Sequence, residues 1–205
     1  TLSKALMHGW MFVIPLRHRV SYGYIHNKDL SKTEEIQKEL HNEINKIDPL
    51  HTVINTRTLS FESFTSDRFL EGSVFSIGNR AAFAEPLEAT AIEFILRECV
   101  EIEEILSKGQ PYEGLDKESQ EKIFNRRLNE EMQRIALFIG WHYSNGSIHE
   151  SDFWKQSKEH YKYMRQTLID NRIVAEFDEW ISTLNYTKSC PERPFFGWSL
   201  RSFEE

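Results

Sequence analysis

The sequence predicts a mixed α/β region followed by a helical one. In the first half, short runs rich in aromatic and β-branched residues lie between turn residues, which is typical of strands. From Pro86 onward, apolar residues recur at helical spacing in four long segments. This change of pattern and the loop at 107–118, which contains Gly and Pro, predict two domains, over residues 1–107 and 108–205.

The strands of the first half are predicted from their composition. Residues 9–16 and 20–27 predict a hairpin that bends at residues 17–19. Residues 52–64 alternate between apolar and polar side chains like a strand, and residues 72–78 predict a short buried strand that ends in glycine.

The helices are predicted from apolar periodicity. Residues 31–47 predict an amphipathic helix, with Ser31 and Glu34 in the positions of a capping box. The helix that follows Pro86 has one predicted buried stripe, made of Leu87, Ala91, Ile95, Cys99, Ile102 and Leu106. Its acidic residues predict a solvated face, at Glu101, Glu103 and Glu104. Three further helices are predicted over residues 119–144, 151–172 and 174–185.

The composition excludes several classes of partner and site. A net charge of −7 argues against a nucleic-acid groove or an anionic membrane surface. No apolar run approaches the roughly 18 residues of a membrane span. The two cysteines, Cys99 and Cys190, fit free thiols in a reducing compartment, so we expect a cytoplasmic protein. The eight histidines show no paired spacing, and we expect no metal site.

Residues 75–95, FSIGNRAAFAEPLEATAIEFI, join the end of a strand to the start of a helix. Gly78 ends the apolar run, and Pro86 fits the first helical turn. Glu88 then falls near the third helical position, where a carboxylate can cap free amides. Free amides at a helix start also bind anions, and the small residues here let a planar ligand approach the backbone. Glu88 is therefore either a cap or a catalytic residue of an anion or cofactor site.

The chain resembles the flavin-dependent halogenases of the tryptophan halogenase type. Residues 77–95 resemble the family segment G-x-x-A/S-G/A-F-x-E-P-L-E-S/A-T-G-I-x-F-I. Residues 10–15, WMFVIP, resemble the family's W-x-W-x-I-P, and YGYIHN at 22–27 resembles the G-Y-V-Y-S strand that follows it. Residues 124–156 resemble the helical Y-N … L-H-Y … R-x-D-T-x-F-W segment. These matches follow one another in the family's order over most of the chain.

The resemblance implies both a fold and a chemistry. The implied fold is part of a Rossmann-like flavin-binding domain with a β-sheet substrate region, followed by a C-terminal helical domain. The implied reaction uses FADH2 from a separate flavin reductase, O2 and a halide ion to form hypohalous acid. This oxidant then halogenates a small electron-rich aromatic, such as an indole, a pyrrole or a phenol. No nucleic acid or membrane partner is implied, and a homo-oligomer is left open.

The resemblance also implies roles for individual residues. Glu88 corresponds to a catalytic glutamate, and Thr90 and Ala91 correspond to the pair that contacts the halide. The positions that correspond to flavin contacts are Gly78, Asn79, Ala82, Phe83, Pro86, Leu87 and Ile92. The positions that correspond to substrate contacts are Trp10, Phe12 and Trp198. Residues 141–143 are either a packed aromatic cluster or part of the substrate cavity.

The chain departs from the family pattern at several points. Phe12 stands where the second Trp is usual, Ala91 where Gly is usual, and Asn79 where Asp or Leu is usual. Neither the G-x-G-x-x-G fingerprint nor the catalytic lysine segment occurs in the 205 residues, and Lys4 lies too close to Trp10 to replace that lysine. We therefore expect the C-terminal portion of a longer halogenase, inactive alone. A flavin-dependent monooxygenase-like enzyme and a non-catalytic aromatic-binding module with the same fold are the alternatives.

Overall fold

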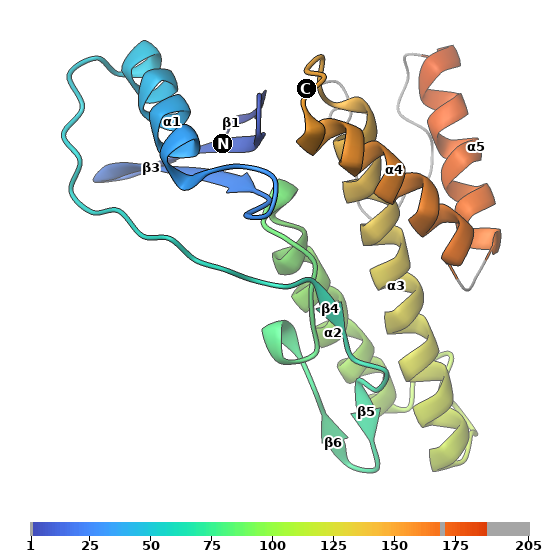
Figure 1. Cartoon of the computed structure of the whole chain (residues 1–205). Coiled ribbons are helices and arrows are strands. Elements are labelled where there is room, and N and C mark those ends of the chain that lie inside the picture. The colour runs from blue at the N-terminus through green and yellow to red at the C-terminus, as the bar shows by residue number, and fades with distance from the viewer. Residues whose placement is uncertain (1, 169–170, 188–205) are drawn as a thin grey trace. The chain divides into compact units, whose positions relative to one another are not determined.

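The described chain is mixed α/β, as the sequence predicts. The computed structural model describes residues 2–168 and 171–187 (Figure 1), but not the side chains of Glu88, Asn171 and residues 183–187. Within these residues the chain forms three small sheets and five α-helices. None of the described helices is long and apolar enough to cross a membrane.

The chain divides into two compact units, which are described separately. Unit 1 comprises residues 2–60 and 140–167, and unit 2 comprises residues 61–139, 168 and 171–187. The domain division at residue 107 remains a prediction.

Unit 1 is built on a three-stranded antiparallel sheet in the order β1 (Leu2–Leu6), β2 (Gly9–Leu16), β3 (Arg19–His26). The predicted hairpin is therefore confirmed, and β1 adds a strand that the sequence pattern did not separate. Helix α1 (Thr33–Ile47) lies beside this sheet in Figure 1. Their shared core consists of Leu6, Met11 and Ile44. Burial of this apolar surface fixes the helix on the sheet.

The start of α1 differs from the predicted capping box. The N-cap residue is Lys32, and its side chain makes no capping hydrogen bond. The Ser31 hydroxyl instead lies 3.1 Å from Nδ1 of His8. The Ser31 hydroxyl thus contacts His8, which is distant in the sequence, and does not cap the helix as the sequence pattern predicts.

Lys4 forms an ion pair with a buried glutamate. Its Nζ lies 2.5 Å from Oε2 of Glu43, a buried residue of α1, and Lys46 Nζ lies 2.5 Å from Oε1 of the same carboxylate. The hydrogen bonds from Lys4 and Lys46 lower the pKa of Glu43. Lys4 therefore ties β1 to α1.

Unit 1 is completed by α4 (Asp152–Thr167) and the last residues of α3 (Lys117–Asn145). At Gly140 a Cβ atom would lie 2.6 Å from Cδ2 of Tyr161, so the two helices approach closely at this point. The buried Trp154 donates its indole N–H to the carbonyl of Leu6, at 2.8 Å. This bond joins α4 to the first strand of the sheet.

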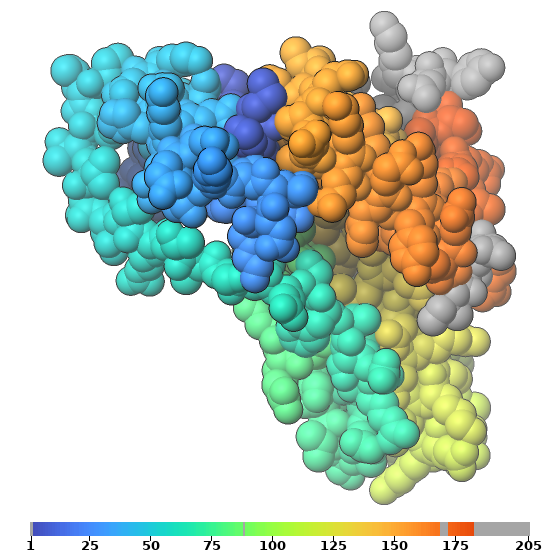
Figure 2. Space-filling view, in the orientation of Figure 1, coloured from blue at the N-terminus to red at the C-terminus, as the bar shows by residue number. Residues whose placement is uncertain are grey.

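Residues 51–63 form no strand, so the prediction for 52–64 is wrong except for β4 (Phe64–Thr65). Apolar side chains in this segment are exposed, Ile54 by 83% and Leu59 by 79%. In Figure 2 the segment is a narrow strip of teal atoms. The segment alternates between apolar and polar residues like a strand, but none of the described residues forms a strand beside it. A strand without a partner lacks the hydrogen bonds between strands that stabilise a sheet.

Unit 2 contains α2 (Thr90–Ser107), most of α3, and α5 (Asn171–Thr187). The buried face of α2 is not the predicted stripe, since Cys99 and Leu106 are exposed. The residues that α2 buries are Thr90, Phe94, Glu98, Glu101 and Ile105. The buried face includes two glutamates, so it differs from the face that apolar periodicity alone predicts.

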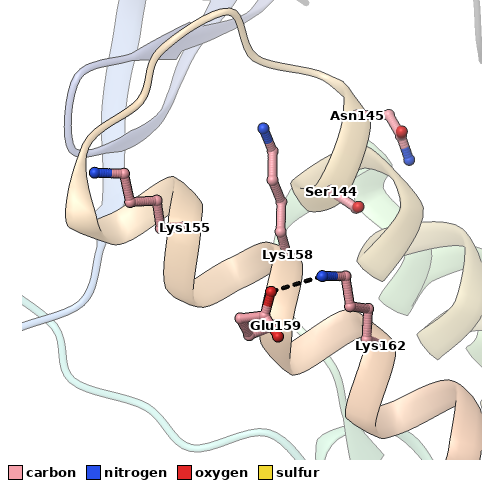
Figure 3. Close-up of a pocket in the computed structure, with 6 residues that line it drawn as sticks. All are labelled: Ser144, Asn145, Lys155, Lys158, Glu159 and Lys162. Carbon is pink, nitrogen blue, oxygen red and sulfur yellow. Dashed lines mark hydrogen bonds and ion pairs between the residues drawn. The ribbon is translucent and has the colours of Figure 1, made fainter.

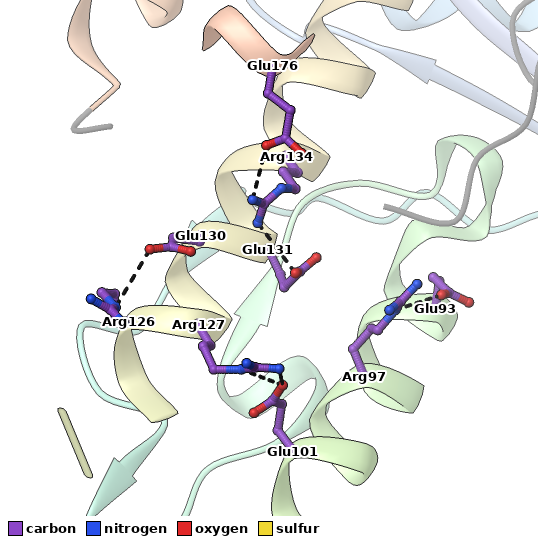
Figure 4. Close-up of polar contacts among 9 residues, drawn as sticks. All are labelled: Glu93, Arg97, Glu101, Arg126, Arg127, Glu130, Glu131, Arg134 and Glu176. Atoms are coloured by element: carbon purple, nitrogen blue, oxygen red, sulfur yellow. Dashed lines mark hydrogen bonds and ion pairs between the residues drawn. The ribbon is translucent and has the colours of Figure 1, made fainter. Parts of the chain in front are cut away.

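The expectation of a solvated face at Glu101 is also wrong. Its carboxylate accepts hydrogen bonds from Nε of Arg127, at 2.7 Å, and from the hydroxyl of Tyr112, at 2.6 Å. Figure 4 shows Arg127 of α3 extended toward Glu101 of α2. These bonds connect the two helices and the loop between them within unit 2.

Candidate functional site

The strand before the candidate site is part of a small hairpin. β5 (Leu70–Glu71) pairs antiparallel with β6 (Val74–Phe75), and Gly72 has a φ of +63° in the turn between them. The strand predicted for residues 72–78 is therefore confirmed only at Val74–Phe75, and its predicted burial is wrong, since the side chain of Val74 is 67% exposed. Gly72 and Ser73 act as turn residues rather than strand residues.

Gly78 begins the turn that leads to the helix. It has a φ of +60° and starts the 3₁₀ turn η1 (Gly78–Arg80), which the Ala81 N–H closes by donating to the Gly78 carbonyl at 2.8 Å. A glycine is favoured there because other residues are strained at positive φ. The Gly78 N–H donates to Oε2 of Glu98, at 2.7 Å. The turn is thus held from α2, twenty residues later in the chain.

The chain then returns through β7 (Ala82–Phe83), which pairs antiparallel with β4. The 3₁₀ turn η2 (Leu87–Ala89) follows, and α2 begins only at Thr90. The backbone of Glu88 therefore lies before the α-helix and not at its third position. The Glu88 side chain is outside the described residues, so its catalytic role remains a prediction.

Glu85 is the carboxylate that the structure places on this turn. Its buried side chain accepts a hydrogen bond from the Leu87 N–H at 3.2 Å, and its carbonyl lies 3.5 Å from the hydroxyl of Thr90. The sequence drew attention to Glu88, which follows Pro86 and Leu87. The sequence also contained a signal for Glu85, since an acidic side chain placed directly before a proline can accept a hydrogen bond from the backbone N–H two residues later.

Ala89 is held in a left-handed conformation, with φ of 52° and ψ of 30°. This conformation strains a residue that has a Cβ atom. We expect Ala89→Gly to raise the free energy of unfolding by about 1 kcal/mol, because glycine adopts positive φ without that strain. Ala91→Gly is the matched control, since position 91 lies inside α2 and glycine there should lower stability by about 1 kcal/mol. Chemical denaturation of both variants measures the two changes, and equal signs would contradict the prediction.

The residues that correspond to flavin contacts differ in exposure. Asn79, Pro86 and Ile92 are exposed, whereas Ala82 and Leu87 are buried and support the backbone of the turn. Gly78 and Phe83 are half-buried. The exposed three are an amide and two apolar side chains, and their role in flavin binding remains a prediction.

The residues that correspond to halide contacts are less accessible. Thr90 is fully buried, and Ala91 is half-buried. Their halide role remains a prediction.

The hairpin residues that correspond to substrate contacts, Trp10 and Phe12, lie in unit 1, whereas the turn from Gly78 to Ile92 lies in unit 2. Trp10 is only 6% exposed and packs edge-on against Trp154, with ring centroids 5.6 Å apart, and against Tyr143 at 6.2 Å. Its indole N–H has no hydrogen-bond partner among the described residues. Phe12 is also buried, and Trp198 lies outside the described residues. The substrate roles of all three remain predictions.

A hollow on unit 1 was not predicted from the sequence. It has a volume of about 590 Å³ and is lined by Lys155, Lys158, Glu159 and Lys162 of α4 with Ser144 and Asn145 of α3. Figure 3 shows Lys162 turned toward Glu159, with which it forms an ion pair of 2.7 Å. The three lysines recur at helical spacing, and this spacing was the sequence signal that could have indicated a basic helix face here.

A comparison with protein families decides the classification. The sequence model of the family described as "Tryptophan halogenase" matches residues 1–185. The chain belongs to the tryptophan halogenase family.

Relatives of known function are consistent with this membership. The chain is 27% identical over 158 residues to the 7-chloro-L-tryptophan 6-halogenase KtzR of Kutzneria sp. (strain 744), covering 77% of this chain and 29% of that protein. It is 27% identical over 159 residues to the tryptophan 7-halogenase RebH of Lentzea aerocolonigenes, covering 78% and 28%. The chain thus spans less than a third of the length of these tryptophan halogenases.

A solved tryptophan halogenase has the same fold as this chain. The structure of the tryptophan halogenase from Shewanella frigidimarina NCIMB 400 aligns with a TM-score of 0.71 and 22% identity, covering 98% of this chain and 36% of that one. The family resemblance stated from the sequence is confirmed by the match over residues 1–185.

Proposed function

We propose that this chain is the C-terminal portion of an FAD-dependent halogenase that acts on an electron-rich aromatic. The match of the family to residues 1–185 carries the proposal. It is supported by the small share of the halogenase relatives that the chain covers, 29% for KtzR, and by the glycine-started turn before α2. The polypeptide would use FADH2, O2 and a halide ion, by way of hypohalous acid.

In this proposal the turn between Gly78 and Ile92 holds the flavin. Asn79 would hydrogen-bond the polar edge of the ring, and Pro86 and Ile92 would pack on its apolar part. When bound, the reduced flavin supplies the reaction with O2 that oxidises the halide. Thr90 and Ala91 would place the halide near the helix start, where the backbone dipoles favour an anion.

Glu88 would act on the substrate side of the site. A carboxylate can accept the proton that an aromatic ring loses when a halogen replaces it. It can also keep a nearby lysine charged, and so preserve that lysine as a hydrogen-bond donor. Both the lysine and the dinucleotide fingerprint would belong to the remainder of the polypeptide. We further propose a cytoplasmic protein that receives FADH2 from a separate reductase.

The test is a halogenation assay on the intact polypeptide that carries this chain. The protein is incubated with enzymatically reduced FAD, bromide and a panel of indoles, pyrroles and phenols, and the products are analysed by mass spectrometry. The bromine isotope doublet is the expected result, with no product from the 205-residue chain alone. Hydroxylated products without halogen would favour the monooxygenase alternative. Binding of the aromatic without any turnover would favour the non-catalytic module.

Glu88→Gln in the intact polypeptide is expected to lower the halogenation rate by about 100-fold, because a neutral amide cannot accept the proton. FAD affinity should stay unchanged, which a fluorescence titration measures. The matched control is Glu103→Gln, since Glu103 is an exposed glutamate of α2. If Glu88→Gln halogenates at the rate of the control, Glu88 is only a structural residue.

A further inference from the structure

Glu98 is a glutamate in an unusual environment. It lies in the third turn of α2 and is 0% exposed. One carboxyl oxygen, Oε2, accepts the hydrogen bond from the Gly78 N–H. The other, Oε1, is buried and has no hydrogen-bond partner in the described part of the chain.

Such a placement is costly, so packing alone does not account for it. A buried carboxyl group loses its hydration, and a single hydrogen bond compensates only part of that loss. Burial raises the pKa of Glu98, and the bond from the Gly78 amide opposes this shift. Of the other positions that α2 buries, Phe94 and Ile105 are apolar, and Glu101, unlike Glu98, has an arginine and a tyrosine as hydrogen-bond partners. A leucine or methionine would fill the same position without the cost of desolvation.

The hydrogen bond to Gly78 is what a leucine could not provide. Gly78 is the first residue of the turn η1, so its N–H has no acceptor within the turn. Ile95 of α2 lies against the same glycine, since a Cβ atom there would be 3.7 Å from Cδ1 of Ile95. One face of α2 therefore supports Gly78 by packing and by one buried acceptor. The next residue, Asn79, is exposed.

We propose that Glu98 is a positioning residue of the flavin site: it fixes the turn at Gly78 and so determines where the Asn79 side chain is presented. This inference rests on the proposed function, because it takes Asn79 as a flavin contact. Glu98 itself touches no cofactor. The required feature is a buried acceptor for one backbone N–H, which either ionisation state of the carboxyl provides.

The test compares three variants of the intact polypeptide. Glu98→Gln keeps an acceptor for the Gly78 N–H and removes the charge. Glu98→Met keeps a similar unbranched volume and removes the acceptor. Glu103→Met is the control for the same substitution at an exposed position of α2. Each protein is examined by thermal unfolding, by FAD titration with an absorption spectrum, and by amide hydrogen exchange over residues 76–83.

We expect Glu98→Gln and the control to bind FAD within about twofold of the wild type. Glu98→Met should bind FAD about tenfold more weakly and show an altered flavin spectrum, which corresponds to the loss of one buried hydrogen bond. Its amides in residues 76–83 should exchange faster. Its unfolding temperature should not fall, because the substitution also removes a buried, desolvated carboxyl. Rescue by Gln but not by Met separates an acceptor role from a packing role.

Hydrogen exchange distinguishes failure of this inference from failure of the proposed function. If the wild type binds no FAD, the proposed function fails, and faster exchange in Glu98→Met still supports the hold on the turn. Unchanged exchange in Glu98→Met overturns the inference whether or not FAD binds. A parallel loss of unfolding temperature and FAD affinity in that variant also overturns it, since Glu98 would then be a general stability residue.

Discussion

Replacing Asn125 by alanine is expected to lower the free energy of unfolding by about 3 kcal/mol, because one side chain supplies three hydrogen bonds to the backbone of two buried residues, Phe69 and Leu70. Its Oδ1 accepts from the N–H groups of Phe69, at 2.7 Å, and of Leu70, at 2.8 Å. Its Nδ2 donates to the carbonyl of Leu70, also at 2.8 Å. The amide of Asn125 thus bonds the backbone at the start of β5 as a neighbouring strand would. Alanine would leave two backbone donors and one acceptor without a partner.

The control for Asn125 is Asn129→Ala, one helical turn later in α3. Among the described residues, the Asn129 side chain makes a single hydrogen bond, from its Nδ2 to the carbonyl of Asn125 within the same helix, at 2.8 Å. We expect its loss to cost about 1 kcal/mol. Chemical denaturation gives the total change, and hydrogen exchange at Phe69 and Leu70 localises it. Equal costs for the two asparagines, or unchanged exchange at these amides, would contradict the prediction.

The effect at Asn125 illustrates what the sequence could and could not predict about the fold. The hairpin of β2 and β3 was predictable, because its pairing is local and its composition is typical of strands. The strand expected at residues 52–64 was wrong, since periodicity indicates what a segment can form but not whether a partner exists. Asn125 belongs to a motif that was recognised, yet its contact lies 55 residues away and leaves no periodic signal.

The candidate site shows the same limit at the level of single carboxylates. Local spacing correctly drew attention to the segment from Gly78 to Ile92, because a glycine, a proline and a helix start are local signals. It did not show which glutamate bonds which amide. Glu85 bonds the Leu87 N–H, and Glu98 bonds the Gly78 N–H from a position twenty residues later. Apolar periodicity would have excluded Glu98 from the buried face of α2.

Among glycine-to-alanine substitutions in unit 1, Gly9→Ala is expected to be the most destabilising. It should lower the free energy of unfolding by about 4 kcal/mol. A Cβ atom at position 9 would lie 1.9 Å from the carbonyl oxygen of Ile25, which is backbone and cannot rotate away. The φ of +154° also disfavours a residue with a side chain. Because Trp10 pairs with Ile25, strands β2 and β3 must separate at the point where Trp10 enters the aromatic cluster.

The matched control for Gly9 is Gly72→Ala. Gly72 also has a positive φ, of +63°, but a Cβ atom there would meet nothing within 4 Å. Its substitution therefore measures conformational strain alone, about 1 kcal/mol. Denaturation gives both losses, and near-ultraviolet circular dichroism reports the packing of Trp10 against Tyr143 and Trp154. Should Gly9→Ala cost no more than the control and leave that spectrum unchanged, β2 and β3 can separate without disturbing the aromatic cluster, and Gly9 is not required for the position of Trp10.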